Sequence, residues 1–349
     1  MEELLEFKKN IISWYPIKEE DTVLQVGENS YILQELKLKT SKVKVTENLK
    51  EITDKFDYIT LIGTFEKLSL DEIKDLLECA TNKLNENGKI LLAMKNKFAM
   101  KYFAGDRINL DAEAFDSIVK SNDNILSLSQ IKKILENLNL KYKFYYPLPD
   151  YEITNVIYTD DFLPNNDNID ARVLTFCGEE EFLNFSERDA YKQLVSADKK
   201  MFPFFANSFF IEVSKNENFE DIRFVSFSIT RKKENRIKTI IRKDKVYKYA
   251  DNKDAINHIN KIANIIKILN ECKIEVLGNT KNNIIECEFL KDAISYDELL
   301  MQYYNQNGLD CCLEKIKEFQ NNILNKLPIE KDIPEKTVFE KYDVEISGE

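Results

Sequence analysis

Several residues suited to binding a ligand follow strand-like runs of this chain. They are Gly27 and Glu28 after Thr22–Val26, Glu47 after Lys42–Val45, and Gly63 and Thr64 after Tyr58–Ile62. Because the carboxyl ends of parallel strands meet at one edge of a sheet, we expect these residues to lie together. A glycine lets the main chain approach a ligand closely, and a carboxylate at a strand tip accepts hydrogen bonds from ribose hydroxyls. The pattern predicts a site for a nucleotide-like cofactor.

Each of these signals also has a purely structural interpretation. A single glycine after a strand often forms only a turn, and the loop Gly27-Glu28-Asn29-Ser30 has one glycine where cofactor loops usually have two or three. Glu47 can equally be a solvated loop carboxylate. The side chains of Glu28 and Ser30 would also narrow the space that a cofactor needs. The sequence therefore leaves open whether this loop admits a cofactor.

A strand, a helix and a second strand must position the residues of this edge. The runs 58–62 and 89–94 are mostly apolar, which is typical of parallel strands covered on both faces. A polar-edged helix over 70–84 and an Asn-Gly turn connect them. This is one βαβ unit of a doubly wound α/β fold, in which Glu66 and Lys95 face the same site.

The segment before this unit is unusually short. A helix over 2–14 precedes the first strand, and only residues 48–55 separate Glu47 from Phe56. A crossover between parallel strands needs a dozen or more residues. We therefore expect the third strand of a complete nucleotide-binding half to be missing.

Composition limits the function classes. The chain has 349 residues, 43% of them hydrophobic, with a net charge of −11, which predicts two domains and argues against nucleic acid as the main partner. Its 6 cysteines show no CxxC spacing and it has 1 histidine, His258, so we expect reduced thiols, no metal site and no Ser-His or Cys-His catalytic pair. No apolar run is long enough to span a membrane and no signal peptide is visible, so we expect a cytoplasmic protein.

Four runs carry a resemblance to a known family. They are LLAMKNKFAMKYFAG (91–105), FYYPLPDY (144–151), IYTDDFLP (157–164) and FFANSFFIEV (204–213). Together they resemble a family of bacterial class I S-adenosylmethionine-dependent methyltransferases associated with surface-glycan biosynthesis, whose members often carry a C-terminal kinase-like module. The resemblance covers residues 12 to about 300. It departs from the family at the first loop, at Met94–Lys97 and at Gly105–Arg107.

The resemblance implies a Rossmann-like sheet whose last two strands form an antiparallel pair, here 142–146 and 208–213. The segment of about 149–203 would be an insertion over the site. S-adenosylmethionine would be the cofactor, and the substrate a sugar, glycan precursor or other small polar molecule. If the first loop admits no cofactor, the domain would instead be a catalytically inactive scaffold that binds partner enzymes or a glycan precursor.

Methyl transfer requires the acceptor atom to be held in line with the methyl group in a dry pocket, and a carboxylate or tyrosine within reach can take the acceptor proton. The candidates for this role are Glu66, Tyr102, Tyr146 and Asp150. Gly27, Glu28, Glu47, Gly63 and Thr64 would bind the cofactor. Aromatic side chains next to a proline, such as Tyr146, are also common in packing at strand ends.

The remaining third of the chain has a different pattern. Three strand-like runs (222–229, 236–241 and 245–249), an amphipathic helix over 254–270, a strand over 283–289 and helices near 296–304 and 309–327 follow a polar linker. Their order resembles the amino lobe of a kinase-like fold, with Lys248 at the lysine position of the third strand. No HRD-like or DFG-like run follows, so we expect no phosphotransfer.

These patterns predict two domains. Residues 1–216 would form a methyltransferase-like domain, and residues 217–349 an α+β module resembling a kinase amino lobe, with a C-terminal helix and tail. A lobe without its mate usually leaves a face to cover. We therefore expect the module to bind a protein partner or a second copy of itself.

Overall fold

The computed structural model describes residues 6–327 except 110, 121–123, 167, 170–184, 275, 277, 282–283 and 292. The chain divides into two compact units, residues 1–259 with 280–289 and residues 260–279 with 290–349. One sheet includes strands on both sides of residue 216. The domain boundary expected at that residue therefore stays a prediction. The charged tail after Leu327 lies outside the described residues.

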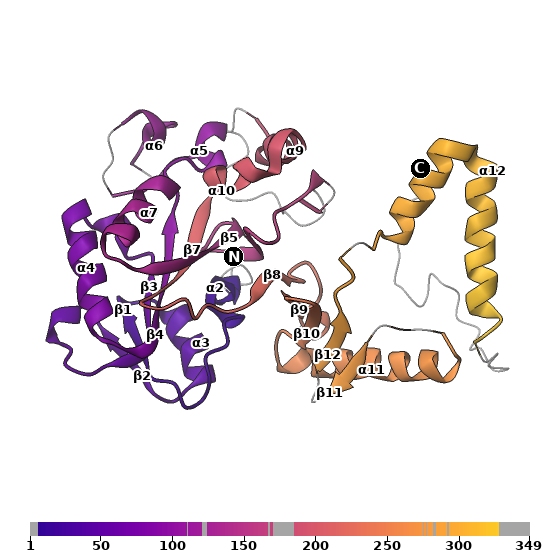
Figure 1. Ribbon diagram of the computed structural model, residues 1–349, viewed down its shortest axis with the longest axis horizontal. Coiled ribbons are helices and arrows are strands. Elements are labelled where there is room, and N and C mark those ends of the chain that lie inside the picture. The colour runs from indigo at the N-terminus through magenta and orange to yellow at the C-terminus, as the bar shows by residue number, and fades with distance from the viewer. Residues whose placement is uncertain are drawn as a thin grey trace. The chain divides into compact units, whose positions relative to one another are not determined.

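Twelve strands form one sheet in the order β11-β12-β10-β9-β8-β6-β5-β7-β4-β3-β1-β2 (Figure 1). Their bounds are β1 Val23–Val26, β2 Val43–Thr46, β3 Phe56–Ile62, β4 Leu84–Lys95, β5 Lys141–Pro149, β6 Thr154–Thr159, β7 Ser208–Ser214, β8 Ile222–Phe227, β9 Ile237–Arg242, β10 Lys245–Ala250, β11 Asn279–Lys281 and β12 Ile284–Glu288. β2, β1, β3 and β4 are parallel, whereas β7 pairs antiparallel with both β4 and β5. The expected antiparallel last pair is confirmed.

The missing strand is also confirmed. Between β2 and β3 the chain forms only the short 3-10 helix η2, Leu49–Glu51. The order β2-β1-β3-β4 therefore matches strands 2-1-4-5 of a doubly wound sheet from which strand 3 is absent. This supports a Rossmann-like α/β fold, and it leaves β2 as the edge strand next to the candidate site.

Helices cover both faces of the parallel strands (Figure 1). Their bounds are η1 Glu6–Lys9, α2 Asn10–Ser13, α3 Ser30–Lys39, η3 Phe65–Lys67, α4 Leu70–Asn82, α5 Met100–Ala104, α6 Asp116–Val119, α7 Leu128–Asn137, α9 Glu187–Asp198, η5 Lys199–Met201, α10 Phe202–Phe205, η6 Lys233–Asn235 and η7 Lys253–Ala255. Side chains of α4 and α7 share one buried core with Leu24 and Leu92, whereas α2 and α3 share the other with Val23 and Leu91. Alternate residues of one strand thus face opposite helix layers.

The insertion expected over 149–203 contains β6, α9, η5 and α10 among its described residues. β6 pairs antiparallel with β5 on one side and with β8 on the other. This pairing extends the sheet from β4, β7 and β5 into β8, β9 and β10. Residues 170–184 of the predicted insertion lie outside the described part.

The elements predicted for the last third of the chain form at nearly the predicted positions. β8, β9 and β10 are antiparallel neighbours, α11 spans Ile256–Glu271, and β12 pairs with β10. The two predicted C-terminal helices are confirmed: α12, Tyr296–Leu324, consists of two helices that meet at a kink where the backbone of Gly308 is not helical. Within the described residues no helix has the length and hydropathy needed to cross a membrane.

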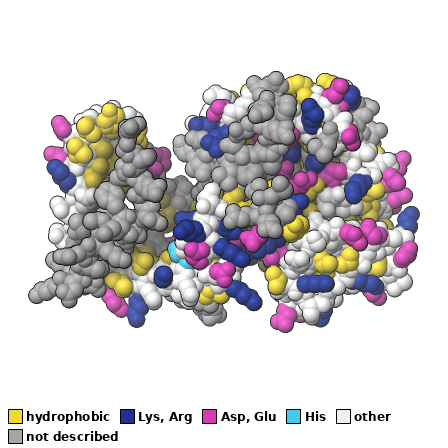
Figure 2. Space-filling model, turned by 180° about the vertical axis from the view of Figure 1, so that it is seen from behind, with side chains coloured by type: hydrophobic (Ala, Val, Ile, Leu, Met, Phe, Trp, Pro, Cys, Tyr) yellow, Lys and Arg dark blue, Asp and Glu magenta, His cyan; other side chains and the backbone are white. Residues whose placement is uncertain are grey.

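Large apolar side chains are exposed on α12. The exposed fraction is 57% for Met301, 59% for Leu309 and 46% for Phe319. Figure 2 shows hydrophobic side chains gathered over this helix, whereas acidic and basic side chains are interspersed over the rest of the face drawn. The exposed apolar surface of α12 is larger than scattered single residues would give.

Raising the pH is expected to stabilise the first unit through Lys39, whose ammonium donates to the carbonyls of Ser13 and Tyr15, both at 2.9 Å. Burial, with a smaller effect of Lys238, lowers the pKa of Lys39 from 10.5 to about 8. The unfolded state binds more protons between these two pKa values, so the free energy of unfolding rises with pH across that window. Denaturant unfolding of the wild type and of Lys39→Met at pH 7.5 and 9.5 checks this. An equal rise in both proteins would contradict it.

Candidate functional site

A cleft of about 640 Å3 lies at the carboxyl ends of β1, β2 and β3. Its walls include all five residues predicted to bind a cofactor, together with side chains from the N-terminal helices, α3, η3 and the β5–β6 turn. The lining residues are Lys8, Ile11, Val26, Gly27, Glu28, Asn29, Ile32, Glu47, Ile62, Gly63, Thr64, Lys67, Leu68, Tyr151 and Glu152. The meeting of three strand tips explains why residues far apart in sequence share one cleft.

Gly27 keeps the first loop open. Its φ of +84° is in the left-handed region, and a Cβ atom built on it would meet no atom within 4 Å. The Gly27 N–H donates to the Thr46 carbonyl at 2.9 Å, which joins the tips of β1 and β2. Gln25 Nε2 donates to the carbonyls of Gly27 and Asn29, and Asn29 caps α3 by accepting from the Ile32 N–H. The loop is thus fixed with open space beside its glycine.

The two acidic residues of these tips line the cleft. Glu28 and Glu47 are both exposed. Since the chain lacks a strand after β2, Glu47 stands at the edge of the sheet with its carboxylate available to a ligand.

Tyr151 and Gly63 form the opposite wall. The Tyr151 hydroxyl donates to Glu66 Oε1 at 3.0 Å, and the same oxygen accepts the Lys95 N–H at 3.0 Å. The Tyr151 hydroxyl oxygen lies 3.0 Å from the place of a Cβ on Gly63, whose φ is +68°. Only glycine fits here without displacing the tyrosine. Glu66 therefore contacts the cleft through Tyr151 and does not line it itself.

Asp150 forms a buried ion pair. Lys101 Nζ donates to Asp150 Oδ2 at 3.0 Å, and the exposed fractions of the two side chains are 9% and 7%. Asp150 Oδ1 accepts the N–H groups of Glu152 and Ile153 at 2.8 and 3.2 Å. These bonds, after the Lys101 charge, lower the pKa of Asp150 against the effect of burial. The carboxylate thus holds the turn that carries Tyr151 and Glu152.

None of the four predicted acceptor-side residues is among the residues that line the cleft, and three of them, Tyr102, Tyr146 and Asp150, are buried. Tyr146 donates its hydroxyl to Asp160 Oδ1 at 2.8 Å. The Tyr102 hydroxyl is buried without a hydrogen-bond partner among the described residues, and burial raises its pKa to about 12. Asp150 has the partners given above. Their catalytic roles stay predictions, whereas Tyr151 and Glu152 of the cleft wall were missed, although Tyr151 ends the FYYPLPDY run.

Three of the four segments that carry the sequence resemblance, 91–105, 144–151 and 204–213, meet in one buried network. Asn207 donates its amide to the Pro149 carbonyl at 2.9 Å and accepts the Lys101 N–H at 3.1 Å. Tyr191 of α9 donates its hydroxyl to Asn207 Oδ1 at 3.1 Å. Residues of α5, β5, α9 and the loop before β7 are thereby held together beside the turn that carries Tyr151.

Replacing Glu187 by glutamine is expected to stabilise the protein at pH 7.5. Glu187 accepts a hydrogen bond from the Asn207 amide, and burial raises its pKa from 4.5 to about 7. The folded state therefore binds more protons between these pKa values, and stability falls as the pH rises from 4.5 to 7. We expect Glu187→Gln to remove that fall and to gain about 2 kcal/mol at pH 7.5. Denaturant unfolding measures the free energy of unfolding of Glu187→Gln, of the wild type and of the control Glu78→Gln, which changes an exposed residue. Equal pH profiles of Glu187→Gln and the wild type would contradict the prediction.

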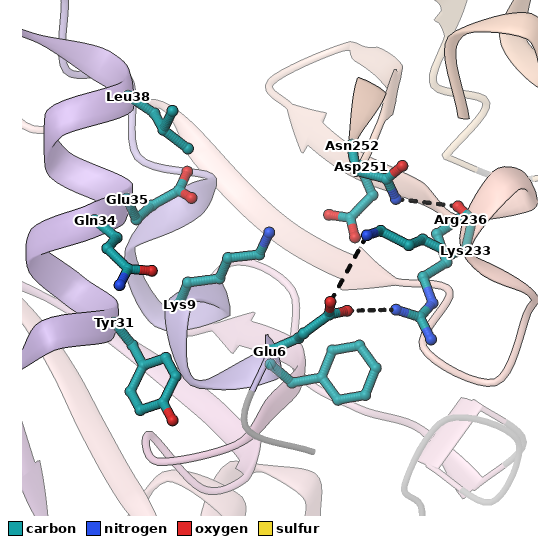
Figure 3. A pocket seen from close by; sticks show the side chains of 11 residues that line it. Glu6, Lys9, Tyr31, Gln34, Glu35, Leu38, Lys233, Arg236, Asp251 and Asn252 are labelled. Carbon is teal, nitrogen blue, oxygen red and sulfur yellow. Dashed lines mark hydrogen bonds and ion pairs between the residues drawn. The ribbon is translucent and has the colours of Figure 1, made fainter. Parts of the chain in front are cut away.

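A second pocket, of about 480 Å3, lies between the N-terminal helices, α3 and the β9–β10 hairpin (Figure 3). Glu6 Oε2 accepts from Arg236 Nη1 at 3.2 Å, and Glu6 Oε1 lies 3.8 Å from Lys233 Nζ. Over the whole lining, the acidic residues Glu6, Glu35 and Asp251 balance the basic residues Lys9, Lys233 and Arg236. None of the lining residues belongs to the tips of β1, β2 or β3, so the cleft is the candidate site.

The described residues provide no set of metal ligands. Among the described residues no group of three or more His, Cys, Asp or Glu side chains is arranged to hold a metal ion. The described cysteines are free thiols at Cys79, Cys272, Cys287, Cys311 and Cys312.

Comparison with known proteins gives structural neighbours only. No family model matches the chain, and no curated protein matches it in sequence. A SAM-dependent methyltransferase from Archaeoglobus fulgidus is similar over 59% of this chain and 92% of its own, with 13% identity and a TM-score of 0.35. A cyclopropane-fatty-acyl-phospholipid synthase-like protein from Lactobacillus casei is similar over 60% and 90%, with 11% identity and a TM-score of 0.32.

A third neighbour is a phosphoethanolamine N-methyltransferase 2 from Haemonchus contortus in complex with phosphomonomethylethanolamine and S-adenosylhomocysteine. It is similar over 62% of this chain and 53% of its own, with 14% identity and a TM-score of 0.32. All three TM-scores are below 0.5, so these neighbours do not decide the function. The strand order and the cleft of this chain are the observations on which its function is inferred.

Proposed function

We propose that the chain is an S-adenosylmethionine-dependent methyltransferase whose cofactor binds in the cleft at the tips of β1, β2 and β3. One observation carries this proposal: the five residues selected as cofactor ligands from the sequence all line this cleft. Its volume of about 640 Å3 is in the range of about 300–1,000 Å3 typical of small-molecule sites.

The residues present fit such a cofactor. The open space beside Gly27 allows the main chain to approach it, and the exposed Glu47 carboxylate can accept from ribose hydroxyls. Gly63 and Thr64 would contact its other end, with Tyr151 as the wall. The bound cofactor would supply an electrophilic methyl group. The chain would contribute alignment and exclusion of water, which give most of the rate in such transfers.

The acceptor, on this proposal, is a hydroxyl or amine of a sugar or other small polar molecule, and surface-glycan assembly in the cytoplasm is the setting that the sequence resemblance suggests. No side chain described above selects a particular glycan. The element order β8-β9-β10-α11-β12 supports the resemblance to a kinase amino lobe as a further hypothesis. The exposed apolar side chains of α12 support a protein partner or self-association.

A catalytically inactive scaffold is the second candidate. It is favoured by the burial of Tyr102, Tyr146 and Asp150, whose exposed fractions are 1%, 0% and 5%. With these three enclosed in the core, the exposed carboxylate of the cleft wall beside Tyr151 is that of Glu152. On this candidate the cleft would bind a ligand or partner without transferring a methyl group.

Isothermal titration calorimetry of the full chain with S-adenosylhomocysteine tests the proposal. We expect saturable binding with a dissociation constant in the micromolar range, about −8 kcal/mol. Absence of heat at millimolar ligand, for protein shown to be folded by its thermal transition, would contradict the proposal and favour the scaffold.

A further inference from the structure

The Tyr151 hydroxyl is fixed in the wall of the cleft. Its hydroxyl donates its one proton to Glu66 Oε1 at 3.0 Å, so only the lone pairs of the phenol oxygen remain for another group. Glu66 Oε1 is itself fixed by the Lys95 N–H at 3.0 Å. Tyr151 lines the cleft, Glu66 is not among the lining residues, and the Tyr151 hydroxyl oxygen lies beside the cleft-lining Gly63. The hydrogen-bonded pair therefore brings a partly negative oxygen to the wall of the cleft.

The carboxylate of Glu66 adds to the negative potential at the Tyr151 oxygen. Glu66 Oε2 is buried and has no hydrogen-bond partner among the described residues. Burial, followed by the charge of Glu66, raises the pKa of Tyr151, so the tyrosine remains protonated. Tyr151 is itself only 8% exposed. A charge in such a position is screened much less than a surface charge.

The rest of the protein holds this pair in place from two sides. The Lys101–Asp150 ion pair and the two N–H groups that Asp150 accepts fix the turn on which Tyr151 stands. On the other side Gly63 leaves room for the phenol oxygen, which lies 3.0 Å from the place of a Cβ. The position of the oxygen is thus determined by tertiary structure and does not depend on the ligand.

We propose that the Tyr151–Glu66 pair recognises the positive charge of a sulfonium, so that the cleft binds S-adenosylmethionine more tightly than the uncharged thioether S-adenosylhomocysteine. This inference rests on the proposed function. A phenol oxygen that donates its hydrogen bond to a carboxylate gains negative partial charge, which makes it a strong partner for a cation. The lining of the cleft agrees, since Glu28, Glu47 and Glu152 outnumber Lys8 and Lys67.

Calorimetry with both ligands tests the inference without any acceptor. The readout is the ratio of the dissociation constant for S-adenosylhomocysteine to that for S-adenosylmethionine. We expect Glu66→Gln to lower this ratio about tenfold, because it removes a poorly screened charge. Tyr151→Phe should lower it about threefold, because it removes the oxygen and leaves the carboxylate.

Two control variants match these changes outside the cleft. Glu78→Gln removes the same charge from the exposed face of α4, and Tyr142→Phe removes a hydroxyl that donates to Glu136 at 2.7 Å. Both should leave the ratio within about twofold of the wild type. Thermal unfolding establishes that each variant is folded.

The outcomes separate the inference from the function. Wild-type protein that binds neither ligand overturns the proposed function and the inference with it. Wild-type protein that binds both ligands, with a ratio unchanged in folded Glu66→Gln and Tyr151→Phe, overturns only the inference. A lowered ratio in both variants and an unchanged ratio in both controls supports it.

Discussion

Gly27→Val is expected to weaken S-adenosylhomocysteine binding by about 100-fold, or about 2.8 kcal/mol. The expected loss follows from open space: a Cβ at Gly27 would meet no protein atom within 4 Å, so a side chain there would project into the cleft. A ligand that lies against the main chain of this loop would then collide with it. Calorimetry of the variant and the wild type measures the change.

Backbone strain must be separated from this collision. The φ of +84° at Gly27 disfavours valine, and we expect the variant to lose about 1–3 kcal/mol of stability for that reason. Gly308 in α12 offers a matched control, since its φ is +81° and a Cβ there also meets nothing within 4 Å. Gly308→Val should cost similar stability and leave binding unchanged. Equal binding by the wild type and Gly27→Val would place the ligand elsewhere.

Lys89→Met is expected to destabilise the protein by about 3–5 kcal/mol. Lys89 Nζ lies 2.6 Å from Glu212 Oε1, with exposed side-chain fractions of 6% and 0%. Glu212 also accepts from the hydroxyls of Tyr15 and Tyr145 at 2.8 and 2.9 Å. Without the ammonium group, a buried carboxylate keeps its hydrogen bonds but loses its counter-charge. Denaturant unfolding of the variant and the wild type gives the difference in free energy.

An exposed pair on the same sheet provides the comparison. Lys44 Nζ lies 3.1 Å from Asp54, but the exposed fractions of these side chains are 49% and 63%. Lys44→Met should therefore cost less than about 1 kcal/mol. Similar losses in the two variants would mean that burial does not govern the Lys89 pair. The double variant Lys89→Met with Glu212→Met should recover part of the loss, because no buried charge remains unpaired.

Much of the cofactor half was predictable from local sequence. Hydrophobic runs identified β1, β3 and β4, and the residues directly after them had to reach the same sheet edge. The absence of a third strand followed from the short distance between Glu47 and Phe56, and η2 occupies that segment. The two-helix expectation for the C-terminus is also confirmed, since the two helices of α12 are separated at Gly308, where the backbone is not helical.

The acceptor side was less predictable. Tyr102, Tyr146 and Asp150 were selected because their residue types suit proton transfer, yet residue type says nothing about which way a side chain points. Along β5 alternate residues face opposite cores, and Tyr146 lies on the face covered by α4 and α7. Asp150 is taken up by Lys101 and by backbone N–H groups. Tyr151, one residue further, is the side chain in the cleft wall.

The sequence by itself determined the parallel strands, their order of appearance and the residues at their tips, because periodicity and chain length act locally. Only the tertiary structure decided that the turn after β5 returns to β3 and places the Tyr151 hydroxyl beside Gly63 and Glu66. Hydrogen bonds and ion pairs between residues far apart in the chain, such as Lys101 with Asp150, fix that return. They depend on distance in space, for which a single sequence carries no periodic signal.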